Sequence, residues 1–260
     1  MQEHIYRELA KIEKKEARLF KDNPNLDIKI LTKKIEAKIP PDFHAKLNSV
    51  FYQGFRLVFK SGTGVIEKTY NKNKTRDEYT VNNYAAKVLG SKQGLRRINL
   101  SAHKKHLSNL GIAAGEGGAL GLLGIGLPDI PIFIGVLLKA VYETALSFGF
   151  DYEKEEEKYY ILLLVEGALG NGPKKERLSP EIDAVAAKID KGVVLNYDLD
   201  LQMRNTAEAL STDLLVMKFI QGLPIVGAVG SVTNAYYCNR VTDYAKLKYK
   251  KRYLLNKLDD

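Results

Sequence analysis

Residues 111–151 read GIAAGEGGALGLLGIGLPDIPIFIGVLLKAVYETALSFGFD. Between Gly117 and Leu138 the single charged residue is Asp129. Glycine and alanine dominate the first half of this stretch and bulky aliphatic residues the second, with Leu-Pro-Asp-Ile-Pro at 127–131 between them. A membrane-spanning helix needs about 20 uninterrupted apolar residues. The two prolines and the aspartate therefore favour a helical hairpin with its apex at 127–131 over a continuous span.

Helical periodicity recurs through the rest of the chain. Ile5, Leu9 and Ile12 lie three or four residues apart, as on one face of a helix. Because no stretch alternates between polar and apolar residues at period two, we predict an all-α fold, a single multi-helix domain. Within it we distinguish a basic N-terminal helical region, 1–110, from a glycine-rich helical core, 111–260.

Two predicted helices, 111–127 and 222–238, are rich in small residues four positions apart. Each glycine inside a helix costs about 1 kcal/mol relative to alanine, and the usual gain is close approach of a neighbouring helix. The residues that we expect to make such helix-packing contacts are Gly117, Gly118, Gly121, Gly227, Gly230 and Ser231. Packing in a soluble core, association with a membrane surface and insertion into a bilayer all remain open, although the mean hydropathy of −0.23 is that of a soluble protein.

The hairpin geometry brings ionisable residues to one level. With Asp129 at the apex, Glu116 lies thirteen residues before it and Glu143 fourteen after it, so the two are at similar heights. Lys139 lies one turn from Glu143 on the same face. Our hypothesis is that Glu116, Lys139 and Glu143, with Asp129 nearby, form a polar layer that is the candidate catalytic site. The alternative is a structural ion pair between Lys139 and Glu143 beside a solvated Glu116.

Charge is unevenly distributed. Residues 1–110 hold 23 basic and 11 acidic side chains, whereas residues 111–260 hold 17 and 20, within a net charge of +9. A basic run near the C-terminus is interleaved with tyrosines and predicts binding to an anionic surface, the alternatives being a nucleic acid or a solvated face. This run consists of Lys246, Lys248, Lys250, Lys251 and Arg252.

Other chemistry is sparse. His103 and His106 are spaced to share a metal ion, but they stand in a basic segment without further ligands, so we expect no metal site and no cofactor. No phosphate-binding loop or hydrolase motif occurs in the sequence. The single cysteine, Cys238, and the charged N-terminal helix without a signal-peptide core lead us to expect a cytoplasmic protein, peripheral at the inner face of the membrane.

Several of these segments together resemble the bacterial EcsC family. The matching segments are Glu116-Gly117-Gly118, Gly126-Leu127-Pro128-Asp129-Ile130-Pro131, Lys139, Gly149-Phe150-Asp151 and the run from Leu223 through Gly230 to Asn234. The chain departs from the family's usual pattern in lacking tryptophan and in having Pro128.

The family is named after a protein encoded beside an ABC transporter, so the resemblance implies an accessory role linked to a transporter or membrane, and it supplies no catalytic residues. We therefore expect a non-enzymatic protein whose partner is an anionic membrane surface or an ABC transporter. An enzyme that uses the Glu116, Lys139 and Glu143 layer is the alternative, and nucleic-acid binding is the weakest of the three.

Overall fold

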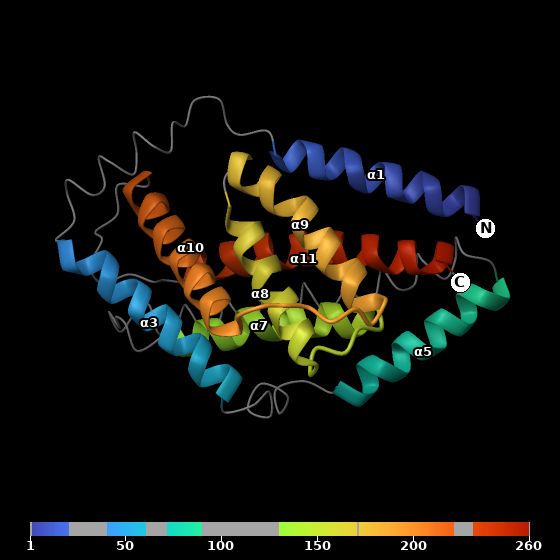
Figure 1. Cartoon of the computed structure of the whole chain (residues 1–260), viewed down its shortest axis with the longest axis horizontal. Helices are drawn as coiled ribbons and strands as arrows, with labels where there is room; N and C mark the ends of the chain where they lie inside the picture. The colour runs from blue at the N-terminus through green and yellow to red at the C-terminus, as the bar shows by residue number, and fades with distance from the viewer. Residues whose placement is uncertain are drawn as a thin grey trace.

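The computed structural model describes residues 2–20, 41–60, 72–89, 130–170, 172–220 and 231–259. These residues form eight helices and no strand, which confirms the all-α prediction (Figure 1). The helices are α1 (Gln2–Phe20), α3 (Pro41–Lys60), α5 (Lys72–Leu89), α7 (Ile130–Ser147), α8 (Glu155–Leu169), α9 (Gly172–Asp190), α10 (Leu199–Ile220) and α11 (Ser231–Asp259).

A parallel pair of helices, α7 and α11, runs through the middle of the bundle (Figure 1). The ring of Phe133 lies 6.1 Å from that of Tyr237, and the ring of Phe148 lies 6.3 Å from that of Tyr253. Because both members of the second pair lie later in the chain, the helices point the same way. The start of α7 is therefore beside the start of α11.

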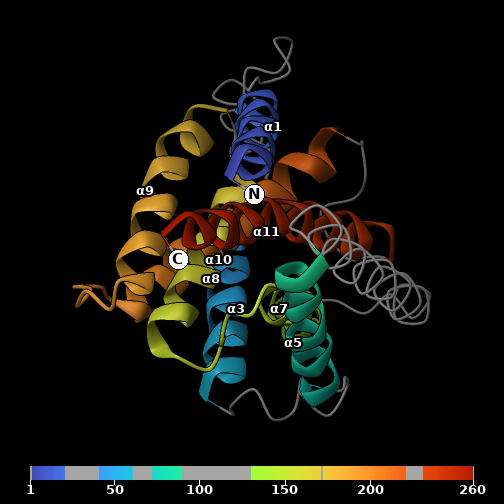
Figure 2. The ribbon, with the colours of Figure 1, turned by 90° about the vertical axis from the view of Figure 1, so that its right-hand side faces the viewer.

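Helices α8, α9 and α1 pack around α11. Arg240 contacts the last carbonyl of α8, that of Leu169, whereas Arg252 contacts Glu157 near its start, so α8 is antiparallel to α11. Figure 2 shows α1 lying along the outside of α11. Because helices surround α11, its side chains are buried on several faces, including Val241, Ala245 and Tyr249. Helix α11 is therefore an interior helix of the bundle, although its sequence contains many cations.

Helix α3 crosses the start of α7 and packs antiparallel to α10. A Cβ atom on Gly54 would lie 2.5 Å from Cδ1 of Ile134, so glycine permits this close crossing. Tyr52 donates a hydrogen bond to Asp200 at the start of α10, and His44 lies 3.2 Å from Thr212, three turns further along that helix.

The end of α7 is a Schellman motif. The N–H of Phe150 donates to the carbonyl of Ala145, the N–H of Gly149 donates to that of Leu146, and Gly149 has φ +86°. A Cβ atom at position 149 would also lie 2.2 Å from Cζ of Tyr79 on α5. Both the backbone conformation and the space therefore require glycine at this motif position.

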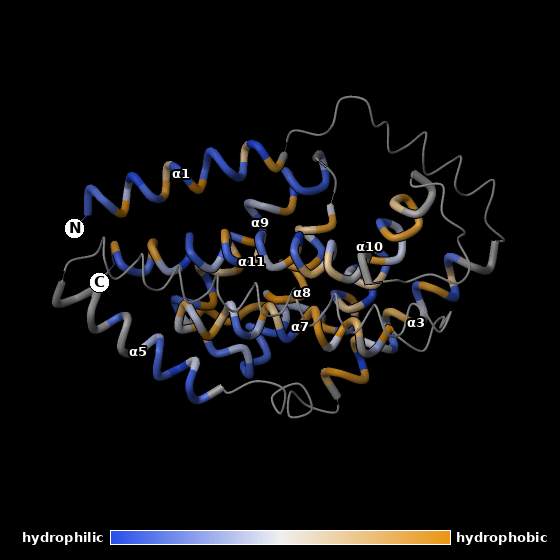
Figure 3. The backbone as a smooth tube through the Cα atoms, turned by 180° about the vertical axis from the view of Figure 1, so that it is seen from behind, coloured by the Kyte–Doolittle hydropathy of each residue, from blue (hydrophilic) through white to orange (hydrophobic). Residues whose placement is uncertain are grey.

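The predicted hairpin apex at 127–131 and the glycine-rich segments fall largely outside the described residues, which resume at Ile130 and Ser231. Among the described helices, none is long and apolar enough to cross a membrane. Figure 3 shows α1 and α5 as mainly hydrophilic, whereas hydrophobic residues are frequent along α7 and α8. The described core therefore centres on α7, α8 and α11.

Candidate functional site: a buried charge network on α11

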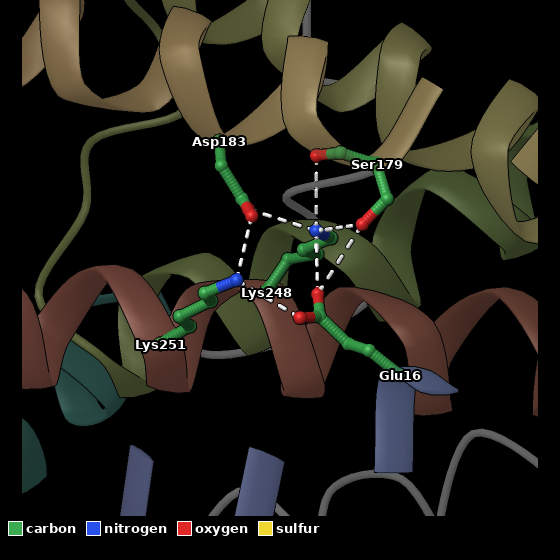
Figure 4. A network of polar contacts seen from close by, with 5 residues as sticks. All are labelled: Glu16, Ser179, Asp183, Lys248 and Lys251. Carbon is green, nitrogen blue, oxygen red and sulfur yellow. Dashed lines mark hydrogen bonds and ion pairs between the residues drawn. The ribbon is translucent and has the colours of Figure 1, made fainter. Parts of the chain in front are cut away.

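Lys248 is the centre of a buried charge network, although it belongs to the predicted basic run. Its side chain is 0 % exposed. The ammonium Nζ lies 2.6 Å from Oε1 of Glu16 and 2.8 Å from Oδ1 of Asp183, and it donates to Oγ of Ser179 over 2.6 Å (Figure 4). These acceptors come from α1 and α9, so one lysine of α11 links three helices.

Lys251, one turn further along α11, contacts the second oxygen of each carboxylate. Its Nζ lies 2.9 Å from Oε2 of Glu16 and 2.6 Å from Oδ2 of Asp183 (Figure 4). Burial alone would raise the pKa of Glu16, but Lys248 and Lys251 lower it below its usual value. Burial would likewise lower the pKa of Lys251, and its hydrogen bonds to Asp183 and Glu16 raise it. The lysines thus stabilise the ionised form of Glu16, and Asp183 and Glu16 stabilise the charged form of Lys251.

Arg252 extends the network to α8. Its Nη1 donates to both carboxylate oxygens of Glu157 at 2.8 and 2.9 Å, and its Nη2 lies 2.7 Å from Oδ1 of Asp190 on α9. The guanidinium carbon lies 4.1 Å from the ring centroid of Phe150, within the range of a cation–π contact. Tyr249 donates a further hydrogen bond to Glu157. Burial opposes the charge of Arg252, but Asp190 and Glu157 raise its pKa further above its usual range.

Two residues of the predicted anionic-surface site, Lys248 and Arg252, are buried against carboxylates and do not reach the surface in this structure. Lys250 and Lys251 are mostly covered and pair with Glu8 and with Glu16 and Asp183. Lys246 is half-buried, and burial lowers its pKa. Four of the five residues of the basic run therefore pair with carboxylates of other helices, namely Lys248, Lys250, Lys251 and Arg252.

The candidate catalytic residues are only partly described. Lys139 and Glu143 are both buried on one face of α7, whereas Glu116 and Asp129 lie outside the described residues. Because Glu116 and Asp129 are outside that part of the chain, the polar layer and its alternative, a structural Lys139–Glu143 pair, both stay predictions. The helix-packing glycines 117, 118, 121, 227 and 230 also lie outside the described residues, and Ser231 is the first residue of α11.

A separate ion-pair clamp, formed by Arg240 and Asp213 and not predicted from the sequence, lies near the start of α11. Nη1 of Arg240 donates to both carboxylate oxygens of Asp213 at 3.0 Å, and Nη2 donates to the carbonyls of Leu169 and Gly170 at the end of α8. A cation is favourable at a helix C-terminus because the carbonyl groups there are left without helical partners. Arg240 therefore joins α8, α10 and α11.

The network around Lys248 and Arg252 and the clamp made by Arg240 each join helices through paired charges. In each, cations pair with carboxylates. Because the partners lie far apart in the sequence, no local sequence pattern predicts these contacts. One signal was present in the sequence: Glu8 and Glu16 alternate with Ile5 and Ile12 on the apolar face of α1. Among the described residues, no group of three or more His, Cys, Asp or Glu side chains is placed to hold a metal ion.

Comparison with known proteins gives the family. The chain is 24 % identical over 161 residues to the uncharacterized protein YdbA of Bacillus subtilis (strain 168), covering 58 % of this chain and 53 % of YdbA. It is 20 % identical over 210 residues to Protein EcsC of the same organism, covering 78 % of this chain and 77 % of that protein. The chain thus spans about half the length of one relative and about three quarters of the other.

No solved structure matches the chain. The EcsC protein family matches residues 3–254, a range that includes the N-terminal hundred residues, where the motifs found in the sequence are absent. The buried clamps and the Gly149 turn therefore all lie within the matched region, and the chain belongs to the EcsC protein family.

Proposed function

We propose that this chain is a non-enzymatic accessory protein that associates with a membrane surface, or with a transporter in it, through its two apolar stretches, 111–127 and 222–238. One observation carries the proposal. The start of α7 packs beside the start of α11, with the rings of Phe133 and Tyr237 6.1 Å apart. The two stretches therefore join the described bundle at the same end and can act on one surface.

The clamp made by Arg240 supports this arrangement. Helix α10 ends at Ile220 and α11 begins at Ser231, so the intervening residues of the second apolar stretch connect these helices. Arg240 and Asp213 tie the two helices together over 3.0 Å, and Arg240 also holds the end of α8. Arg240 thus fixes α11 to α8 and α10 close to where the second apolar stretch enters α11. Such a fixed position suits a segment that must transmit a docking contact to the rest of the protein.

Vesicle flotation tests the proposal. Wild-type protein is expected to float with phosphatidylcholine vesicles that contain phosphatidylglycerol. The double variants Leu122→Asp with Leu123→Asp, and Ile225→Asp with Val226→Asp, are expected to remain at the bottom of the gradient, because charged groups are costly in the interface.

The matched control is Val193→Asp with Val194→Asp, which places the same charges on a loop whose valines are already exposed. It should float like the wild type. Wild-type protein that never floats, or apolar-stretch variants that float as well as the control, would contradict the membrane role.

A second candidate, an enzyme, is favoured by the burial of Lys139 and Glu143 on one face of α7. Such ionisable groups in an apolar helix are costly unless they serve a structural or chemical purpose. Hydrolysis of lipid and peptide substrates by the wild type, but not by Glu143→Gln, would promote this function. Absence of turnover, together with unchanged stability of Glu143→Gln, would remove it.

A further inference from the structure

Helix α1 contacts the bundle along a narrow strip of its surface, the seam, which consists of Ile5, Glu8, Leu9, Ile12 and Glu16. It lies on the outside of α11 and also contacts α9 (Figure 2). Among its described apolar side chains, Ile5 and Ile12 are fully buried, and Leu9 is partly buried against the core. A helix attached by so few apolar side chains depends on its polar contacts for much of its hold on the bundle.

Those polar contacts pair acidic residues of α1 with basic residues of α11. Glu8 lies 2.6 Å from Lys250, and Glu16 lies 2.6 Å from Lys248 and 2.9 Å from Lys251. Three of the four lysines in the basic run are thus covered by two carboxylates of one helix. The outward side chains of α1 include exposed cations, namely Arg7, Lys11, Lys14, Lys15 and Arg18.

We propose that α1 is a releasable cover over a basic surface of α11, formed by Lys248, Lys250 and Lys251, and that this surface binds an anionic membrane once α1 moves away. Glu8 and Glu16 occupy the positions that headgroup phosphates would take. The inference rests on the membrane role proposed above and adds a second, electrostatic contact to the apolar one. Asp183, on α9, stays beside Lys248 and Lys251 and keeps them oriented when α1 leaves.

A membrane fits this exchange better than a nucleic acid does. When α1 leaves α11, its apolar seam of Ile5, Leu9 and Ile12 must find another apolar environment. An amphipathic helix with a cationic polar face can bury such a seam in the lipid interface, whereas a nucleic acid offers no equivalent. The outward cations of α1 would also draw the closed protein toward an anionic surface.

A pair of matched variants tests the cover. Glu8→Gln with Glu16→Gln removes both carboxylates from the seam, whereas Glu3→Gln with Glu13→Gln removes two exposed carboxylates of the same helix and changes the net charge equally. On phosphatidylglycerol-containing vesicles the seam variant should bind about tenfold more tightly than the exposed-face variant, because it makes the lysines of α11 accessible to the anionic lipid. Equal binding by the two variants would overturn the proposal.

A cross-link tests the same movement in protein with the seam closed. In a Cys238→Ala background, Glu8→Cys and Lys250→Cys would be joined by a short bis-maleimide that holds α1 on α11. The cross-linked protein should lose its extra affinity for phosphatidylglycerol over pure phosphatidylcholine vesicles, and the same protein without cross-linker should keep it. A cross-linked protein that keeps the full preference would contradict a releasable cover, even if the seam variant failed to fold.

These outcomes separate the two proposals. Substitutions at Leu122 and Leu123 test the apolar contact and should weaken binding to both vesicle types, whereas the cross-link should remove only the anionic increment. If the apolar variants bind normally but the seam variant still gains affinity, the proposed docking through 111–127 fails and the cover survives. If the seam variant gains more affinity for duplex DNA than for anionic vesicles, the assignment to lipid is overturned.

Discussion

Helices α7 and α11 run side by side in the same direction, yet they bury charge in different ways. Lys139 and Glu143 lie one turn apart on α7, both buried on the same face of that helix. Lys248 and Arg252, also one turn apart on α11, are met by carboxylates from α1, α8 and α9. On α11 the cost of burying these cations is offset by carboxylates from other helices.

The largest effect is expected at Arg252. Arg252→Ala would leave Glu157, whose side chain is 2 % exposed, without its cation, and should lower the free energy of unfolding by about 3 to 5 kcal/mol. Urea denaturation measures the change. The matched control is Arg204→Ala on α10, where the exposed pair with Asp200 should contribute less than about 1 kcal/mol. Similar losses at both positions would show that the buried network has no special stabilising role.

The next effect compares one lysine from each helix. Lys248→Met would leave Glu16 and Asp183 to share Lys251 and should cost about 2 to 3 kcal/mol. Lys139→Met should change the stability by less than about 1 kcal/mol, because methionine keeps the buried apolar stem and Lys139 is not part of the charge network on α11. Thermal and urea denaturation of the two variants give the comparison directly. A larger loss for Lys139→Met would mean that α7 holds a charge network of its own.

The turn between α7 and α8 gives a smaller difference. Gly149 and Gly192 both have positive φ, but a Cβ atom at 149 would strike Tyr79, whereas at 192 it would meet nothing within 4 Å. Gly192→Ala should cost about 1 kcal/mol for the left-handed backbone, and Gly149→Ala about 1 to 3 kcal/mol more for the displaced ring. If urea denaturation gives equal losses for the two variants, the ring of Tyr79 moves aside without lowering the free energy of unfolding.

The smallest effect concerns pH. Burial would raise the pKa of Glu8, but Lys11 and Lys250 lower it from 4.5 to about 2, and the pKa of Glu16 is lowered as well. Because the folded-state pKa values are depressed, their contribution to stability is fully present above pH 4.5 and is lost as pH falls toward 2. Wild type should therefore exceed Glu8→Gln with Glu16→Gln in stability, by about 1 kcal/mol after allowing for solvent screening. Denaturation at a series of pH values should show this difference shrinking in acid, and a difference independent of pH would contradict it.

The sequence predicted much of the fold because helical periodicity is a local property. It identified the helical run of Ile5, Leu9 and Ile12 in α1, the all-α class and the motif at Gly149. The structure gives the physical reason for the motif glycine, which is a left-handed turn packed under Tyr79.

The site could be predicted only in part, because its contacts are not local. The lysines and tyrosines of α11 look like a solvated face in sequence, and nothing near them shows that Glu16 and Glu157 will meet them. Burial of Lys139 and Glu143 followed from their place in an apolar helix, so that part of the hypothesis agrees with the structure. The acidic positions on the apolar face of α1 were the one local sign of an inward-facing charge network.

Lysine acylation followed by mass spectrometry tests the central claim, that the basic run of α11 is held inside the bundle. Native protein would be treated with an amine-reactive reagent, and modification of Lys248, which is 0 % exposed, would be compared with that of the exposed Lys14 and Lys191. The structure predicts that Lys248 stays unmodified while the two exposed lysines react fully, and that denaturation removes the difference. Modification of Lys248 at the same rate as Lys14 in the native protein would contradict the account.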